Sequence, residues 1–250
     1  MKNALTFTFV FLAIQIAGGA LLVLPFDMGL LPDDPALRLI VPTAVVGIVT
    51  IIVFLLTKWT VVSRHWVQTR PWVALFWCVL AALGVLIPSS WFQEQMPELP
   101  NIAEESFDLI LKDRWGYFVV GLLAPLSEEI VFRGAVLRSL LRWRENPWVG
   151  IVISALLFAL IHMNPAQMPH AFLIGLLLGW MYYRTDSIVP GVVYHWVNNT
   201  VAYVLYNFYP DPDMRLIDLF GSQRSVLMAL VFSLCIFLPS LYQLHLTLRK

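Results

Sequence analysis

Apolar stretches that could cross a lipid bilayer recur along the whole chain. A helix of about 20 residues spans the hydrocarbon core of a membrane, and eight segments reach or approach that length. They lie at about residues 5–24, 39–57, 72–90, 115–137, 148–163, 169–183, 189–207 and 225–247. No long polar segment separates them. The sequence therefore predicts one all-α, polytopic membrane bundle of about eight transmembrane helices, with residues 1–250 forming a single integral membrane domain.

The composition fits a lipid environment. Hydrophobic residues make up 59% of the 250 positions and charged residues 13%, whereas a soluble domain carries about 25% charged residues. The net charge is zero, and the basic residues form no run that could follow a phosphate backbone, so we expect no nucleic-acid partner. Cys78 and Cys235 each stand alone in an apolar stretch, and we interpret both as packing residues.

The loop charges predict which helix ends share a side of the membrane, because Lys and Arg in short loops are retained on the cytoplasmic side. With the N-terminus inside, ten basic residues fall on the inner side and five on the outer side, whereas twelve of the sixteen acidic residues fall outside. The ten inner residues are Lys2, Lys58, Arg64, Arg70, Arg138, Arg142, Arg144, Arg184, Arg249 and Lys250. Both termini are therefore expected to be cytoplasmic, in a multi-pass protein of the cell membrane.

Three charged residues, Glu128, Glu129 and Arg133, lie inside the fourth apolar segment. Each charge near the centre of a span costs about 2.5–3.5 kcal/mol on insertion scales, while each large apolar residue returns only about 0.3–0.6 kcal/mol. The segment must therefore face a polar interior. Pro125 precedes the charges, so we expect the helix to break or kink there, with Ser127 capping a new helical start.

Helical spacing separates the roles of these charges. Glu129 and Arg133 are four residues apart, in the orientation that favours an ion pair on one helix face. Glu128 points about 100° away and is left as the freer carboxylate. The alternative is a buried ion-pair network that only orients helices, and this alternative is stronger for Glu129 and Arg133 than for Glu128.

Further polar residues interrupt the neighbouring apolar segments. His162 ends one of them, and His195 with Asn199 shares one face of another by their spacing of four residues. A lone histidine in a membrane helix is most often a hydrogen-bonded core residue, but two histidines, an amide and a free glutamate in successive segments predict one site. Asn198 is expected to pack elsewhere. His170 is either a further member of the cluster or, as we prefer, a residue at a helix entry.

This set of side chains favours water activation. The chain has no Gly-x-Ser-x-Gly motif, and neither cysteine neighbours a histidine. Glu and His can together deprotonate a water, and a second His with an Asn can stabilise the oxyanion of a tetrahedral intermediate. No cofactor is required. A divalent metal such as zinc, held by Glu128, His162 and His195, stays open, although no HExxH motif is present.

In this order, Glu-Glu-x-x-x-Arg at 128–133, Phe-x-x-x-His at 158–162 and His-x-x-x-Asn at 195–199 resemble the CAAX-protease and bacteriocin-processing (CPBP, or Abi) family. The resemblance covers about residues 115–205, the expected catalytic core. It implies an intramembrane endopeptidase in which Glu128 and His162 activate water, His195 and Asn199 stabilise the oxyanion, and Glu129 and Arg133 support them.

The partners implied by the resemblance are membrane lipid and a peptide or lipidated, CAAX-like protein substrate. Two other functions stay open on the residues alone. Intramembrane carboxylates and histidines also serve proton-coupled transporters, although no inverted repeat is visible. A non-catalytic bacteriocin-immunity or scaffold protein could keep the same fold.

Overall fold

The computed structural model describes residues 1–63, 66, 71–209 and 214–248, and all regular secondary structure in them is helical. The predicted inner-side residues Arg64, Arg70, Arg249 and Lys250 lie outside the described residues. The π-helical segments are labelled η. The elements are α1 (Lys2–Ala13), η1 (Ile14–Gly18), α2 (Gly19–Asp27), α3 (Pro35–Leu56), α5 (Trp72–Glu94), α6 (Glu104–Lys112), η2 (Tyr117–Leu123), α7 (Ala124–Glu129), η3 (Ile130–Leu137), α8 (Arg138–Leu141), α9 (Pro147–Leu160), α10 (Met168–Thr185), α11 (Val189–Phe208), α12 (Leu216–Phe220) and α13 (Gln223–Thr247).

Each of the eight predicted segments is helical, which confirms the all-α architecture. Four helical stretches of the described chain are long and apolar enough to cross a membrane: Lys2–Asp27, Pro35–Leu56, Trp72–Glu94 and Gln223–Thr247. The helix Pro147–Leu160 is apolar but shorter. These helices support a multi-pass membrane protein, and the full count of eight crossings stays a prediction.

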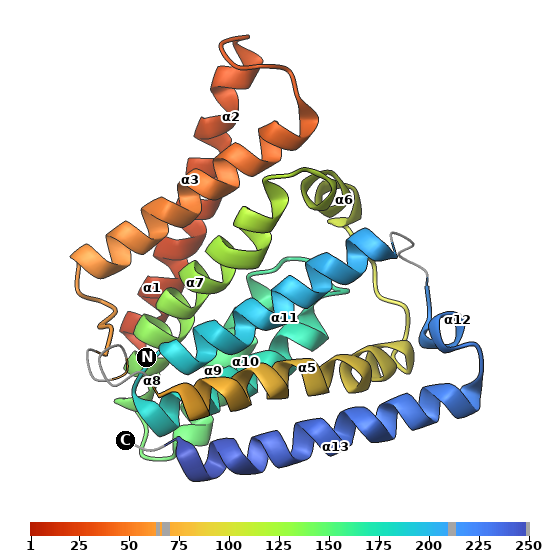
Figure 1. Ribbon diagram of the computed structural model, residues 1–250. Coiled ribbons are helices and arrows are strands. Elements are labelled where there is room, and N and C mark those ends of the chain that lie inside the picture. Colours follow the sequence, from red (N-terminus) through yellow and green to blue (C-terminus); the bar gives the residue numbers. More distant parts are fainter. Residues whose placement is uncertain (64–65, 67–70, 210–213, 249–250) are drawn as a thin grey trace.

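One continuous helical rod, formed by η2, α7, η3 and α8, lies at the centre of the bundle (Figure 1). It contacts α1 and α3 on one side and α9, α10 and α11 on the others. Every residue of η3 is buried. On the outside, α13 packs along α5, and α5 in turn packs against α11. The segment predicted to carry the buried charges is therefore the element most fully enclosed by protein.

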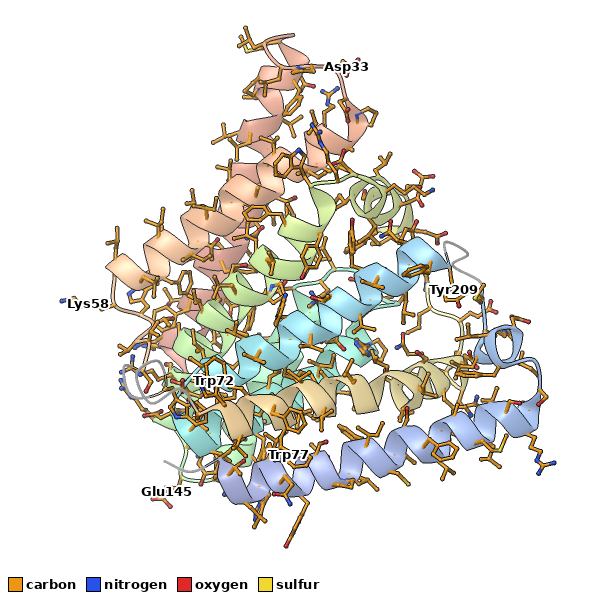
Figure 2. All side chains as sticks on the ribbon, viewed as in Figure 1. Asp33, Lys58, Trp72, Trp77, Glu145 and Tyr209 are labelled. Carbon is orange, nitrogen blue, oxygen red and sulfur yellow. The ribbon has the colours of Figure 1, made fainter. Side chains whose placement is uncertain are left out.

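The start of α1 and the end of α13 lie at the same end of the bundle. Figure 2 shows Lys58, Trp72 and Glu145 at this end, and Asp33 and Tyr209 far from it. Arg184, at the end of α10, donates to the carbonyl oxygens of His245 and Leu248 and so ties the C-terminal helix to this end. The even number of crossings and the cytoplasmic location of both termini stay predictions.

The expected helix break at Pro125 is wrong. Pro125 lies in the first turn of α7, but the backbone stays helical from η2 through α7 into η3. The wide turns of η2 precede the proline, and π-helical turns are a known way for a helix to absorb an irregularity in its hydrogen-bond ladder. Ser127 does not cap a helix start, because its hydroxyl donates to the carbonyl oxygen of Ala124 within the same rod.

The two cysteines differ. Cys78 is fully buried, as a packing residue should be. Cys235 is exposed, so its interpretation as a packing residue is wrong. It lies on α13, which covers the outside of α5 and leaves its other face uncovered by protein. An apolar sequence around a cysteine cannot distinguish a face that packs on protein from one that faces lipid.

Close contact between α9 and α10 follows from two glycines spaced four residues apart. A Cβ atom at Gly175 would lie 3.0 Å from the Cβ of Ala155, and one at Gly179 would lie 3.0 Å from Cγ2 of Ile151. Small residues at such a spacing let membrane helices approach closely. This contact holds Phe158, which lies 3.4 Å from the same Cβ position at Gly175, beside the buried charges.

Candidate active site

The central ion pair of the site is fully buried. Arg133 donates from Nη1 to Oε1 of Glu129 over 2.7 Å, and the two side chains are 1% and 0% exposed. Nη2 of Arg133 also donates to the carbonyl oxygen of Gly175 on α10, over 3.4 Å. The predicted pairing of Glu129 with Arg133 is therefore present. Because a buried charge is tolerated only when it is paired and hydrogen-bonded, each partner depends on the other.

His195 on α11 links this ion pair to the second carboxylate. Its Nδ1 lies 3.2 Å from Oε1 of Glu129, and its Nε2 lies 3.8 Å from Oε2 of Glu128. An ionised carboxylate only accepts hydrogen bonds, so the contact between Nδ1 of His195 and Glu129 assigns a proton to Nδ1. Nε2 is then the nitrogen that faces Glu128, at a distance too long for a direct hydrogen bond.

Glu128 is the more accessible of the two carboxylates. Its side chain is 17% exposed, whereas that of Glu129 is completely enclosed. No hydrogen bond from a described side chain occupies it, and Nε2 of His195 lies 3.8 Å from its Oε2. The division of roles expected from helical spacing, with Glu129 bound to Arg133 and Glu128 left free, agrees with this geometry.

His162 follows the end of α9 and is oriented by its own helix. Its Nδ1 lies 2.8 Å from the carbonyl oxygen of Phe158. A carbonyl oxygen can only accept, so Nδ1 carries the proton and Nε2 of the neutral ring keeps its lone pair. The ring is half-buried and so remains able to reach a ligand.

Phe158 lies between the two histidines and Arg133, a role that its residue type did not predict. Its ring lies edge-to-face with His162 at 5.0 Å and with His195 at 5.8 Å, measured between centroids. The guanidinium carbon of Arg133 lies 4.4 Å from its ring centre. Phe158 thus keeps the two histidines apart and shields the cation from water. Its position four residues before His162 was the available signal.

The side chain of Asn199 is fixed by a hydrogen bond to the neighbouring helical segment. Its side-chain nitrogen donates to the carbonyl oxygen of Val120 over 3.0 Å, which joins α11 to η2. Asn198, expected to pack elsewhere, instead donates to Oδ1 of Asn199 over 3.3 Å, while its own buried oxygen has no hydrogen-bond partner. Asn199 retains one side-chain N–H for a ligand.

A cavity of about 330 Å³ lies between α5, α11 and α12, and His170 and Asn198 line it. Nδ1 of His170 lies 3.4 Å from the side-chain nitrogen of Gln93 on α5. His170 also lies within electrostatic range of His162 and His195. The structure therefore places His170 beside the cluster, as well as in the first turn of α10, where it was expected.

The described side chains do not form a metal-binding group. No set of three or more His, Cys, Asp or Glu residues among them is arranged to hold an ion. Nδ1 of His195 is held by Glu129 and Nδ1 of His162 by the carbonyl oxygen of Phe158, which leaves Nε2 of each ring as the nitrogen that could bind a metal. A divalent metal held by Glu128, His162 and His195 therefore stays a prediction.

Gly191 gives a test of how tightly Glu129 is held. A Cβ atom at Gly191 would lie 2.7 Å from Oε2 of Glu129, whose other oxygen is fixed by Arg133 and His195. We expect Gly191→Ala to destabilise the protein by about 1–3 kcal/mol, as overpacking does in cores, and to reduce activity. Thermal unfolding in detergent measures this.

The control for Gly191→Ala is Gly19→Ala, since a Cβ there meets nothing within 4 Å and the backbone is helical. An alanine in an open helical position is expected to leave stability unchanged or slightly raised. Equal melting temperatures for the two variants would contradict the close packing of Glu129 against α11.

The segment that carries these residues is similar to a known protein family and to two proteins of other organisms. Residues 111–201 match the family model described as type II CAAX prenyl endopeptidase Rce1-like, which confirms the resemblance over that segment. A UPF0177 protein, YxdF, of Lactococcus lactis is 29% identical over 79 residues, which is 31% of this chain and 42% of that protein. An uncharacterized 24.3 kDa protein of Escherichia coli is 33% identical over 87 residues, which is 32% of this chain and 39% of that protein.

The chain thus spans about two fifths of the length of these two relatives. No solved structure is significantly similar to the chain. The family match covers every residue of the cluster from Glu128 to Asn199.

Proposed function

From the premise that residues 111–201 carry an Rce1-like segment, we propose that the protein is an intramembrane endopeptidase. It hydrolyses peptide bonds in a membrane-associated or lipidated, CAAX-like substrate, with a water activated by Glu128. The observation that carries the proposal is the pairing of an accessible carboxylate with an imidazole whose other nitrogen is fixed by a buried ion pair.

The reacting water binds between Glu128 and His195. Oε2 of Glu128 and Nε2 of His195 are 3.8 Å apart. This distance is too long for a direct hydrogen bond between the two groups, but it allows one water oxygen to lie within hydrogen-bond reach of both. Glu128 takes a proton from this water as the hydroxide oxygen adds to the scissile carbonyl carbon. Nε2 of His162 keeps a lone pair and accepts a hydrogen bond from the second O–H of the water, which orients the water while that proton stays on its oxygen.

The negative charge that develops on the carbonyl oxygen needs hydrogen-bond donors. In its protonated form His195 donates from Nε2, while Glu129 accepts from Nδ1 and keeps the ring in place. Asn199 supplies its remaining side-chain N–H. Collapse of the tetrahedral intermediate breaks the C–N bond, and the protonated Glu128 returns its proton to the leaving amine.

Glu129 and Arg133 are positioning residues in this mechanism. Glu129 fixes His195, and Arg133 compensates the buried charge of Glu129. The cavity lined by His170 and Asn198 offers room for the substrate chain beside the cluster, and the unpartnered oxygen of Asn198 can accept a peptide N–H.

The experiment that tests the function is cleavage in liposomes. The purified chain is reconstituted with quenched fluorescent peptides, each made with and without a lipid anchor, and new termini are identified by mass spectrometry. We expect cleavage of anchored peptides at least about tenfold faster than of the free ones, because anchoring raises the local substrate concentration. Proton flux across the same vesicles without cleavage of any anchored peptide would contradict the proposal and indicate a transporter.

A further inference from the structure

A second cavity lies at the end of the bundle where α1 begins and α13 ends. Its volume is about 650 Å³, and it is formed by the start of α1, the turn after α3, and residues of η3 and α8 with the turn that follows. We call it the basic pocket, after the four cations that line it together with two tryptophans: Lys2, Lys58, Arg138, Arg142, Trp59 and Trp143.

The charge of the basic pocket is uncompensated. Four of its lining residues are cationic and none is acidic. Within the described part of the chain, none of the four cations forms an ion pair. Like charges gathered around one hollow repel each other, so an anion bound there relieves an electrostatic cost.

The wall of the basic pocket is held in place by packing. Lys58 adopts a left-handed backbone with φ of 58°, a conformation that a non-glycine residue keeps only where its surroundings impose it. The next residue, Trp59, packs on Phe7 at 4.9 Å and on Phe54 at 5.3 Å between ring centres. The turn that presents Lys58 is therefore fixed to α1 and α3.

The surroundings of the basic pocket indicate where its anion comes from. Large apolar side chains are exposed on the same two helices, with Leu5 at 49%, Phe9 at 73% and Leu56 at 77%. Exposed apolar surface of this kind on membrane helices faces lipid, and tryptophans such as Trp143 favour the headgroup level. Cations at the junction of these two zones match a phosphate with acyl chains attached.

We propose that the basic pocket binds the phosphate group of an anionic phospholipid, with the acyl chains lying along the exposed apolar faces of α1 and α3. The bound phosphate bridges Lys2 on α1, Lys58 after α3 and the arginines of α8 and the turn after it. Because η3 contacts α1 and continues into α8, the lipid stabilises the rod that carries Arg133. The proposal stands apart from peptide hydrolysis and needs no activity to be tested.

The test measures thermal unfolding of the purified full-length chain in a neutral detergent. Added phosphatidylglycerol is expected to raise the melting temperature by about 5 °C at saturation, whereas phosphatidylcholine, whose headgroup has no net charge, leaves it unchanged. Inorganic phosphate and glycerol phosphate at equal concentration form the third arm. A rise with these soluble phosphates as large as that with phosphatidylglycerol would support a phosphate site but overturn its assignment to lipid.

Paired substitutions decide whether the basic pocket is responsible. Lys58 and Arg142 are exposed, so the double variant Lys58→Gln, Arg142→Gln should fold and lose most of the rise with phosphatidylglycerol. The matched control is Arg114→Gln, Arg224→Gln, which removes two exposed cations that do not line the basic pocket and should keep the full rise. An unchanged rise in the first variant, or an equal loss in both, would overturn the proposal.

Discussion

Replacing Arg133 with methionine is expected to lower the free energy of unfolding by about 3–5 kcal/mol, because it leaves Glu129 as a buried carboxylate without its cation. The pair is enclosed in the most buried element of the bundle, with the side chains 1% and 0% exposed. Denaturation of the purified variant in detergent, followed by circular dichroism, measures the loss. The control is Lys112→Met, which breaks an exposed pair with Asp108 at the same spacing and should have a far smaller effect.

A double variant separates stability from activity. Glu129→Leu combined with Arg133→Met replaces both charges with apolar groups, a change that is often neutral or stabilising for a buried ion pair. We expect stability to return to near the wild-type value while cleavage stays lost, since His195 no longer has a carboxylate at Nδ1. A stable and fully active double variant would contradict the positioning role of Glu129, and a stable Arg133→Met would contradict the burial of the pair.

The sequence predicts the helices well because its strongest signals are local. Apolar length set the approximate positions of all eight segments, and the spacing of four residues identified the Glu129–Arg133 pair. These features depend on residues within a few turns of one helix. The same local reasoning failed at Pro125, because the π-helical turns that accommodate it leave no clear signal in residue type.

The parts of the site that the sequence could not predict join distant segments. Glu129 and His195 are 66 residues apart, and their contact depends on how α7 and α11 are rotated against each other. The role of Phe158 and the gathering of four cations from three segments depend on the same packing. Periodicity assigns a residue to a helix face but does not say which neighbour that face meets.

Glu128→Gln is expected to lower the rate of peptide cleavage by about 10²–10⁴-fold, the usual contribution of a general base. The amide has nearly the shape of the carboxylate but cannot accept a proton from water. Glu128 is partly exposed, and the ion pair that it forms among the described residues is a long one, at 3.8 Å from His195. The substitution should therefore leave folding and membrane insertion unchanged, which thermal unfolding verifies.

The most direct measurement of the central claim compares three proteins in the same liposomes with one anchored peptide: the wild type, Glu128→Gln and Glu145→Gln. Glu145 is exposed in the turn between α8 and α9, away from the site residues of α7, and serves as the matched control. We expect cleavage at the wild-type rate by Glu145→Gln and at least about a hundredfold loss in Glu128→Gln. A folded Glu128→Gln protein that cleaves the peptide at the wild-type rate would contradict the central claim.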